Sequence, residues 1–233
     1  MLIQMLDNAQ NVRLFSYEDH NTIASSTYIQ IKNDIIFGKL SPGSKLKLES
    51  LKNSYKASVS TLRETLNRLA SEGFVASEEQ RGFFVTGVSK GDLIEVANLR
   101  VLLECHALEQ SIANGDTEWE GDLVAAYHKL NIMEKKMLSG DESEKEVWKR
   151  YDWEFHLCLI RNCNSKNLLS FHSQLFSKYL RYQMLVITYR GDEAAQEHKE
   201  IFDAALARDP KKASQSLEKH IVRGLNHTLD AMV

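Results

Sequence analysis

Four side chains in the second half of the chain have the types and spacings of a metal site. Asp152 and His156 are four residues apart in a segment with helical periodicity, so their side chains share one helix face. His198 and His220 lie 11 residues before and 11 residues after position 209, where Pro210 predicts a turn between two helices. In a helical hairpin, residues equidistant from the turn lie at the same height, here about 16 Å from it at about 1.5 Å per residue.

Three imidazoles and one carboxylate suit a divalent cation, with Zn²⁺ or Ni²⁺ as the first choices. Such a ligand set leaves coordination positions open for water or an anionic ligand. The ordinary alternative is that each histidine is hydrogen-bonded separately within its own helix, and spacing by itself favours that alternative. Another use of the same cluster is a metal-dependent hydrolase or lyase with a bound water as nucleophile. Against an enzyme, no further carboxylate or histidine stands at a spacing that indicates a general base.

The segment that carries these residues reads as a series of helices. From Ser89 onward no stretch alternates like a strand for long. Short loops between long helices favour antiparallel neighbours, so residues 89–233 are predicted to form an all-α antiparallel helical bundle. The predicted helices are Lys90–Asn114, Glu118–Leu138, Glu142–Asn162, Lys166–Tyr189, Glu193–Arg208 and Lys211–Met232.

The composition is that of a folded protein. The chain has 233 residues, of which 43% are hydrophobic and 26% charged, enough to bury a core. No apolar run reaches the roughly 18 to 20 residues that span a bilayer, and the N-terminal region lacks the pattern of a secretory signal. The three cysteines form no CxxC pair, which favours a reducing compartment. We therefore expect a cytoplasmic protein with no membrane partner. A redox sensor using Cys158 and Cys163 is disfavoured, because side chains five residues apart diverge by about 140° on a helix.

Positive charge is concentrated between Thr27 and Val88. This segment has nine lysines and arginines against six acidic residues, whereas the whole chain has a net charge of −3. Cationic segments gain affinity for nucleic acids because they release counterions from phosphates. The charge distribution therefore favours a module that faces a polyanion.

The same segment predicts a winged helix-turn-helix domain over residues 27–88. Thr27 stands where a helix cap would, and the helix that follows is expected to end before the turn at 41–43. Helices over 49–55 and 58–72 are separated by about three residues and therefore cross steeply. Two short β-rich runs, 74–76 and 82–86, flank a polar tip and predict a hairpin. Residues 1–26 show no sustained period and are expected to form a flexible arm.

The second helix of the motif presents small hydroxyl side chains at its N-terminus, where a helix favours phosphate oxygens. Arg63 lies one turn further along and could reach a phosphate or a guanine edge. The predicted DNA-contacting residues of helix and hairpin are Lys47, Ser58, Ser60, Thr61, Arg63, Arg68, Arg81 and Gly82. For any single one of them, the alternative is a capped helix with solvated charged side chains.

This segment resembles the GntR family of bacterial transcription regulators. The matching residues are Leu40-Ser41-Pro42-Gly43-Ser44-Lys45-Leu46, then Leu51, residues 62–75 and Arg81-Gly82-Phe83-Phe84-Val85. The resemblance implies operator DNA as a partner. One departure is Val59, because the family usually carries an arginine there, four positions before Arg63. The preferred operator is therefore expected to differ from the family's common one.

The helical region, from about Asp92 to near the C-terminus, resembles the FCD effector domain of the FadR-type members of that family. Their Asp-x-x-x-His, His and His motif is met in order by Asp152, His156, His198 and His220. The resemblance thus implies that these four side chains bind one divalent metal ion together.

Three further residues are predicted to bind an effector. Arg100 matches an arginine of the family's first effector-domain helix, which commonly points toward the pocket. Its guanidinium would suit a carboxylate, and the alternative is a surface ion pair with Glu104 at i+4. Arg181 and Tyr182 are expected to line the same cavity.

These features together predict a mainly α, homodimeric bacterial regulator, expected to be a repressor, with a winged helix-turn-helix domain and an FCD-like bundle. Two winged domains would read the half-sites of a palindromic operator, because one short recognition helix reads too few base pairs. A small organic acid bound at the metal would then change the spacing of the wings.

Overall fold

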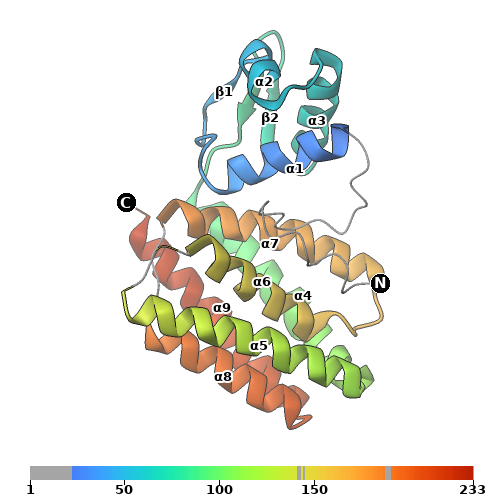
Figure 1. Cartoon of the computed structure of the whole chain (residues 1–233), viewed down its shortest axis with the longest axis vertical. Coiled ribbons are helices and arrows are strands. Elements are labelled where there is room, and N and C mark those ends of the chain that lie inside the picture. The colour runs from blue at the N-terminus through green and yellow to red at the C-terminus, as the bar shows by residue number, and fades with distance from the viewer. Residues whose placement is uncertain (1–22, 141–142, 144, 187–189, 233) are drawn as a thin grey trace. The chain divides into compact units, whose positions relative to one another are not determined.

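The computed structural model describes residues 23–140, 143, 145–186 and 190–232. The chain divides into two compact units that meet in sequence at Gly87 and Val88. Helices dominate both units, and the small sheet of the described residues belongs to the first unit (Figure 1). The mainly α fold predicted from the sequence is thereby confirmed. Among the helices described, none is both long and apolar enough to cross a membrane.

The N-terminal unit is a helix-turn-helix with a three-stranded wing. Its strands pair antiparallel in the order β1-β3-β2, with Lys45 opposite Phe84 and Val75 opposite Val85. The elements are α1 (Ile23–Ile36), β1 (Lys45–Leu46), α2 (Leu48–Tyr55), α3 (Val59–Ser71), β2 (Val75–Glu78) and β3 (Gly82–Val85).

Two details of this unit differ from the sequence-based expectation. α1 begins at Ile23, so Thr27 is buried inside the helix and does not cap it. The residues before Thr27 contain no proline or glycine that would stop a helix there. The helix ends at Ile36, and the left-handed Gly38 (φ 76°) follows. The predicted arm over residues 1–26 otherwise lies outside the described residues.

The apolar stripe of α3 positions the recognition helix. Leu62, Leu66 and Leu69 are fully buried together with Ile31 and Ile35 of α1. The opposite face of α3 consequently points away from the core.

A polar cluster ties α1 to the end of α3. The Tyr28 hydroxyl donates to the Glu72 carboxylate at 2.6 Å, and Lys32 Nζ lies 2.8 Å from the same carboxylate. Tyr55 of α2 likewise donates to Asp34 of α1 at 2.6 Å. Both helices of the motif are therefore anchored to α1.

The second unit is a bundle whose most extensive helix contacts are α4 with α9, α5 with α6, α8 with α9 and α4 with α7. Its core includes Trp119, Phe155 and Tyr179, and Trp119 Nε1 also donates to the Cys158 carbonyl at 2.9 Å. The helices are α4 (Lys90–Asn114), α5 (Thr117–Leu138), α6 (Lys145–Ile160), α7 (Lys166–Val186), α8 (Asp192–Leu206) and α9 (Pro210–Ala231).

Side-chain caps set where several of these helices begin. Ser89 accepts from the Asp92 amide, Asp116 from that of Trp119 and Asp209 from that of Lys212. The helix bounds agree with the predicted ones to within about three residues where the structure describes them. The predicted start at Glu142 and end at Tyr189 lie outside the described residues.

Candidate metal centre and DNA-contacting surface

The N-terminus of α3 presents a row of hydroxyl groups. Ser58 caps the helix by accepting from the Thr61 amide at 3.1 Å, and its Oγ lies 2.8 Å from Ser60 Oγ. Ser58, Ser60 and Arg63 are exposed. Because the buried stripe faces α1, the exposed hydroxyls and Arg63 form the surface that a phosphate backbone could approach.

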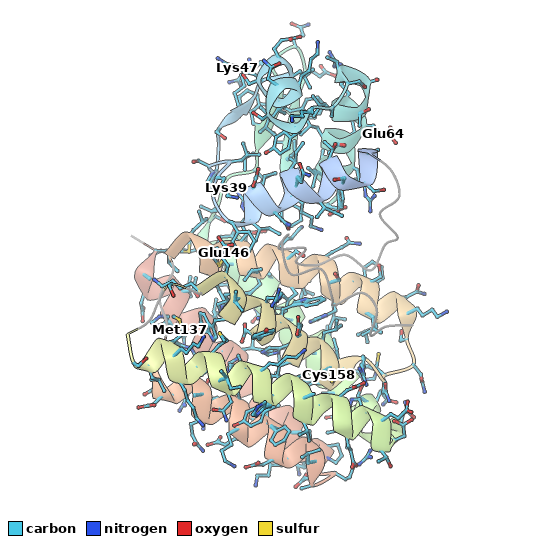
Figure 2. The ribbon with its side chains drawn as sticks, in the orientation of Figure 1. Lys39, Lys47, Glu64, Met137, Glu146 and Cys158 are labelled. Carbon is cyan, nitrogen blue, oxygen red and sulfur yellow. The ribbon has the colours of Figure 1, made fainter. Side chains whose placement is uncertain are left out.

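The wing and α2 add charge to this unit. Arg81 is 70% exposed, pairs with Glu78 and lies over the Phe84 ring. Gly82 follows with a φ of +92°, a conformation that favours glycine. Lys47 directly precedes α2. Its side chain extends outward, and so does that of Glu64 on α3 (Figure 2).

Arg68, which is also predicted to contact DNA, has partners within the domain. Its guanidinium lies 4.0 Å from the centre of the Tyr28 ring and 3.6 Å from Glu72. A cation stacked on a ring and beside a carboxylate is stabilised by both. Arg68 therefore packs between α1 and α3 while its side chain stays 43% exposed, and its contact with DNA remains a prediction.

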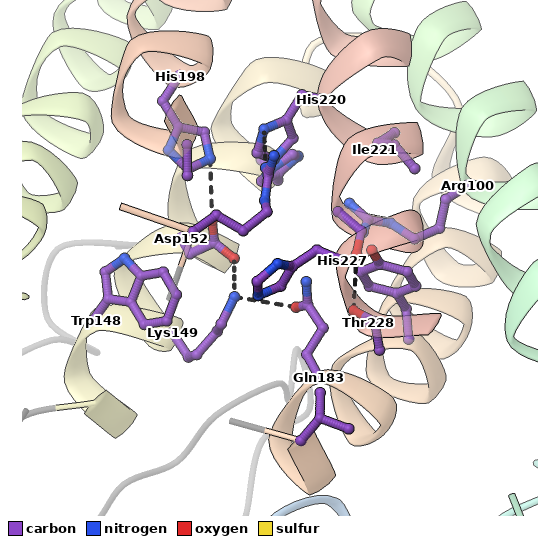
Figure 3. A pocket seen from close by; sticks show the side chains of 16 residues that line it. Arg100, Trp148, Lys149, Asp152, Gln183, His198, His220, Ile221, His227 and Thr228 are labelled. Carbon is purple, nitrogen blue, oxygen red and sulfur yellow. Dashed lines mark hydrogen bonds and ion pairs between the residues drawn. The ribbon is translucent and has the colours of Figure 1, made fainter. Parts of the chain in front are cut away.

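The four predicted metal ligands come together in the helical unit. Asp152, His156, His198 and His220 are all buried, and one potential ligand atom of each lies within 4.8 Å of those of the others. The centres of the His198 and His220 rings are 4.4 Å apart, and His198 Nε2 is 3.3 Å from Asp152 Oδ1. Figure 3 shows His198, His220 and Asp152 converging from different helices.

Each of these histidines uses its other ring nitrogen on a buried carboxylate. His156 Nδ1 lies 3.0 Å from Glu104, His198 Nδ1 2.6 Å from Glu134 and His220 Nδ1 2.9 Å from Glu197. Because an ionised carboxylate only accepts, each ring donates from Nδ1, which directs its Nε2 toward the other predicted ligands.

Burial favours the neutral form of His156 and His220. Burial lowers the pKa of His156, and burial together with the charge of His198 places the pKa of His220 well below its usual value. Burial also lowers the pKa of His198, but Glu134 and Asp152 outweigh it and raise that pKa to about 9. In the metal-free protein, His198 therefore holds a proton between two carboxylates, where a cation would otherwise lie.

Asp152 is held ionised. Burial raises the pKa of its carboxyl, but Lys149 and His198 outweigh burial, so the pKa lies well below its usual range. Lys149 Nζ is 3.4 Å from Asp152 Oδ2 and 3.1 Å from Gln183 Oε1 (Figure 3). The carboxylate is therefore ready to accept a cation without losing a proton.

Arg100 and Glu104 form a buried ion pair and not the surface pair that was the alternative. Arg100 Nε donates to Glu104 Oε1 at 2.6 Å and Nη2 donates to Oε2 at 3.1 Å. The guanidinium lies 4.5 Å and 4.3 Å from the ring centres of Phe176 and Tyr179. Through these two hydrogen bonds Arg100 holds Glu104 in place beside His156. Arg100 also lines the cavity described next.

A cavity of about 40 Å³ adjoins the cluster. Arg100, Lys149, Arg190 and all four predicted ligands are among the residues that line it. Arg181 and Tyr182 are not lining residues, contrary to the prediction. Tyr182 donates to Asp92 at 2.6 Å and accepts from the Ser89 amide at 3.3 Å, because this side of α7 faces the start of α4.

Sequence reasoning missed the carboxylates behind the ligands, together with Lys149 and Arg190. Glu104 was considered only as the partner of Arg100, although His172 Nε2 also lies 3.0 Å from it. No spacing rule relates Glu134 to a histidine 64 residues away. Burial of acidic residues in an apolar helix stripe is the only signal that could have identified them.

The residues present fit a divalent metal ion. They supply three imidazole nitrogens and one carboxylate oxygen, and the Nδ1 hydrogen bonds orient every ring toward the same point. Nitrogen and oxygen donors of this kind suit Zn²⁺ or Ni²⁺. A bound ion would act as a Lewis acid toward an anionic ligand.

Comparisons with known proteins agree with both units. Residues 23–85 match the model of bacterial regulatory proteins of the gntR family, and residues 95–223 match the FCD domain. The HTH-type regulator BphR of Paraburkholderia xenovorans is 35% identical over 86% of this chain and 82% of its own. The transcriptional repressor GlaR of Escherichia coli is 31% identical over 84% of this chain and 90% of its own.

Solved structures support the fold. E. coli McbR/YncC superposes with a TM-score of 0.77 at 19% identity, covering 90% of this chain and 98% of its own. A GntR regulator from Rhodococcus sp. RHA1 reaches 0.74 at 21% identity over 90% of this chain and 99% of its own. The relatives are transcriptional regulators and not hydrolases or lyases, so the enzyme alternative is wrong. The chain belongs to the GntR family of DNA-binding transcriptional regulators and carries an FCD domain in its helical unit.

Proposed function

We propose that this regulator is a homodimeric repressor in the bacterial cytoplasm whose affinity for a palindromic operator is set by a small carboxylate bound at a metal ion. The observation that carries the proposal is the buried Asp/His cluster, in which each ring points its free nitrogen toward the other ligands. Repressor activity is supported by relatives that bear that name, among them GlaR.

An anionic effector agrees with the chemistry of the cavity. Arg100, Lys149 and Arg190 line it beside the predicted metal ligands. Three histidines and one aspartate leave coordination positions of a divalent ion open, and carboxylate oxygens suit those positions. Cationic side chains nearby would then favour an acid over an uncharged ligand of equal size.

A dimer is supported by an exposed apolar face on α4 and α7. Leu102 of α4 is 66% exposed and Phe171 of α7 is 65% exposed. Phe171 lines a groove of about 290 Å³ together with Leu99 and Leu175. Contiguous apolar surface of this kind commonly marks an interface. We expect a second copy of the chain to cover this face, because a two-fold dimer places two recognition helices on two half-sites.

Arg63→Ala is predicted to weaken operator binding by about 1 to 3 kcal/mol, because it removes a guanidinium from the exposed face of α3. Lys39→Ala is the matched control, since Lys39 is a 71% exposed cation of the same unit outside the recognition helix. Fluorescence anisotropy with labelled operator at fixed salt measures both. A folded Arg63→Ala protein with wild-type affinity would contradict the assignment.

The same titration, repeated with small carboxylic acids and metal-loaded wild-type protein, tests control by an effector. Coupling free energies between two sites are commonly about 1 to 3 kcal/mol, so operator affinity should change about 5- to 150-fold. Operator affinity that stays constant with every acid that binds would rule out this form of control.

His198→Ala is predicted to lose most of the bound metal, because it removes the ligand held between Glu134 and Asp152. Exposed His106 on α4 provides the control, and His106→Ala should retain the wild-type content. Glu134→Gln should weaken metal binding about 10- to 100-fold. Elemental analysis of untagged protein and a chelator competition give these values. Equal metal content in His198→Ala and wild type would remove the site from consideration.

Phe171→Glu is predicted to shift the protein from dimer to monomer and to lower operator affinity with it, since a buried unpaired charge opposes association. Val124→Glu is the control, because Val124 is an exposed apolar residue of α5, outside the α4–α7 face. Sedimentation equilibrium distinguishes the two states. A dimeric Phe171→Glu protein would place the interface elsewhere.

A further inference from the structure

The guanidinium of Arg190 keeps a donor that the protein does not use. Arg190 directly precedes the cap of α8 and lines the cavity beside the cluster. Its Nη2 donates to Glu197 Oε2 at 2.8 Å. Its Nη1 is buried and has no hydrogen-bond partner among the described residues. A buried donor without an acceptor is costly, so a ligand that supplies an acceptor at this position would be stabilised.

Arg100 differs from Arg190 in this respect. Both its Nε and its Nη2 donate to Glu104, and aromatic rings of Phe176 and Tyr179 lie against the guanidinium. Its position is therefore determined by the protein itself. Of the two arginines at the cavity, Arg190 has the greater capacity to bind a ligand.

Lys149 supplies a second cation with spare capacity. An ammonium group has three donors, and Lys149 places two of them near Asp152 and Gln183. Lys149 and Arg190 both line the cavity, one from α6 and one from the chain before α8. An anionic group in the cavity can therefore meet donors from two separate segments.

We propose that Arg190, assisted by Lys149, binds one carboxylate of a short dicarboxylate effector while the other carboxylate takes the open positions of the metal. This proposal rests on the proposed function and names the ligand class of the same site. The small volume of the cavity, about 40 Å³, restricts the ligand to a short chain.

The test compares acids of equal carbon number by calorimetry on zinc-loaded protein: malonate with propionate, succinate with butyrate, and so on to adipate with hexanoate. The wild type should bind its best dicarboxylate about 10- to 100-fold more tightly than the matched monocarboxylate. This ratio of affinities corresponds to the free energy of one hydrogen bond to a charged group. Arg190→Gln should reduce this ratio to near one, and Arg190→Lys, which keeps the charge, should retain part of it.

Arg223→Gln is the matched control. Arg223 pairs with the other oxygen of Glu197 at 3.0 Å, but it is 48% exposed and does not line the cavity. This variant should retain the dicarboxylate preference. The proposal is overturned if the wild type shows no preference for a dicarboxylate, or if Arg190→Gln retains the wild-type ratio.

Metal content and operator affinity, measured on the same preparations, separate this failure from failure of the proposed function. Wild type that binds metal and responds to monocarboxylates as strongly as to dicarboxylates would contradict only the role of Arg190. Wild type that binds no metal, or whose operator affinity no bound acid changes, would contradict the proposed function itself.

Discussion

The hydrogen bonds between three buried carboxylates and three histidines are the interaction on which the helical unit depends. Glu104, Glu134 and Glu197 are at most 3% exposed, and each lies beside Nδ1 of a different predicted ligand. A carboxylate removed from water costs several kcal/mol unless it is paired. The pairing requirement therefore determines which helix faces meet and which tautomer each ring adopts. The metal ligands are oriented as a consequence.

Because of the same pairing requirement, the residues of the site come from several helices of the unit. α4 supplies Glu104, α5 supplies Glu134, and the ligands come from α6, α8 and α9. A change in ligation would alter pairings on each of these helices at once. α4 is the helix that directly follows the winged domain in sequence, and it carries both Arg100 and Glu104. A change in the pairings at the cluster would therefore reach the helix that directly follows the winged domain in sequence.

The sequence was sufficient to predict the elements and the four residues that cluster, but not the pairings between carboxylates and histidines. Helical periodicity and the i, i+4 spacing of Asp152 and His156 are local signals, and the family resemblance added His198 and His220 to the same predicted site. Glu134 has no such signal, because its partner is 64 residues away. Arg181 and Tyr182 were placed in the cavity although Tyr179 and Gln183 line it. Each residue turns a helix by about 100°, so a small phase error moves a side chain to another face. β1 has only two residues, too few to show alternation.

Long-range ¹H–¹⁵N NMR of the histidine rings in zinc-loaded protein tests the arrangement of the metal site most directly. The account predicts that His156, His198 and His220 all carry a proton on Nδ1, facing Glu104, Glu134 and Glu197, and all bind the metal through Nε2. A spectrum in which any of these rings binds through Nδ1, or in which zinc leaves the three rings unchanged, would contradict it.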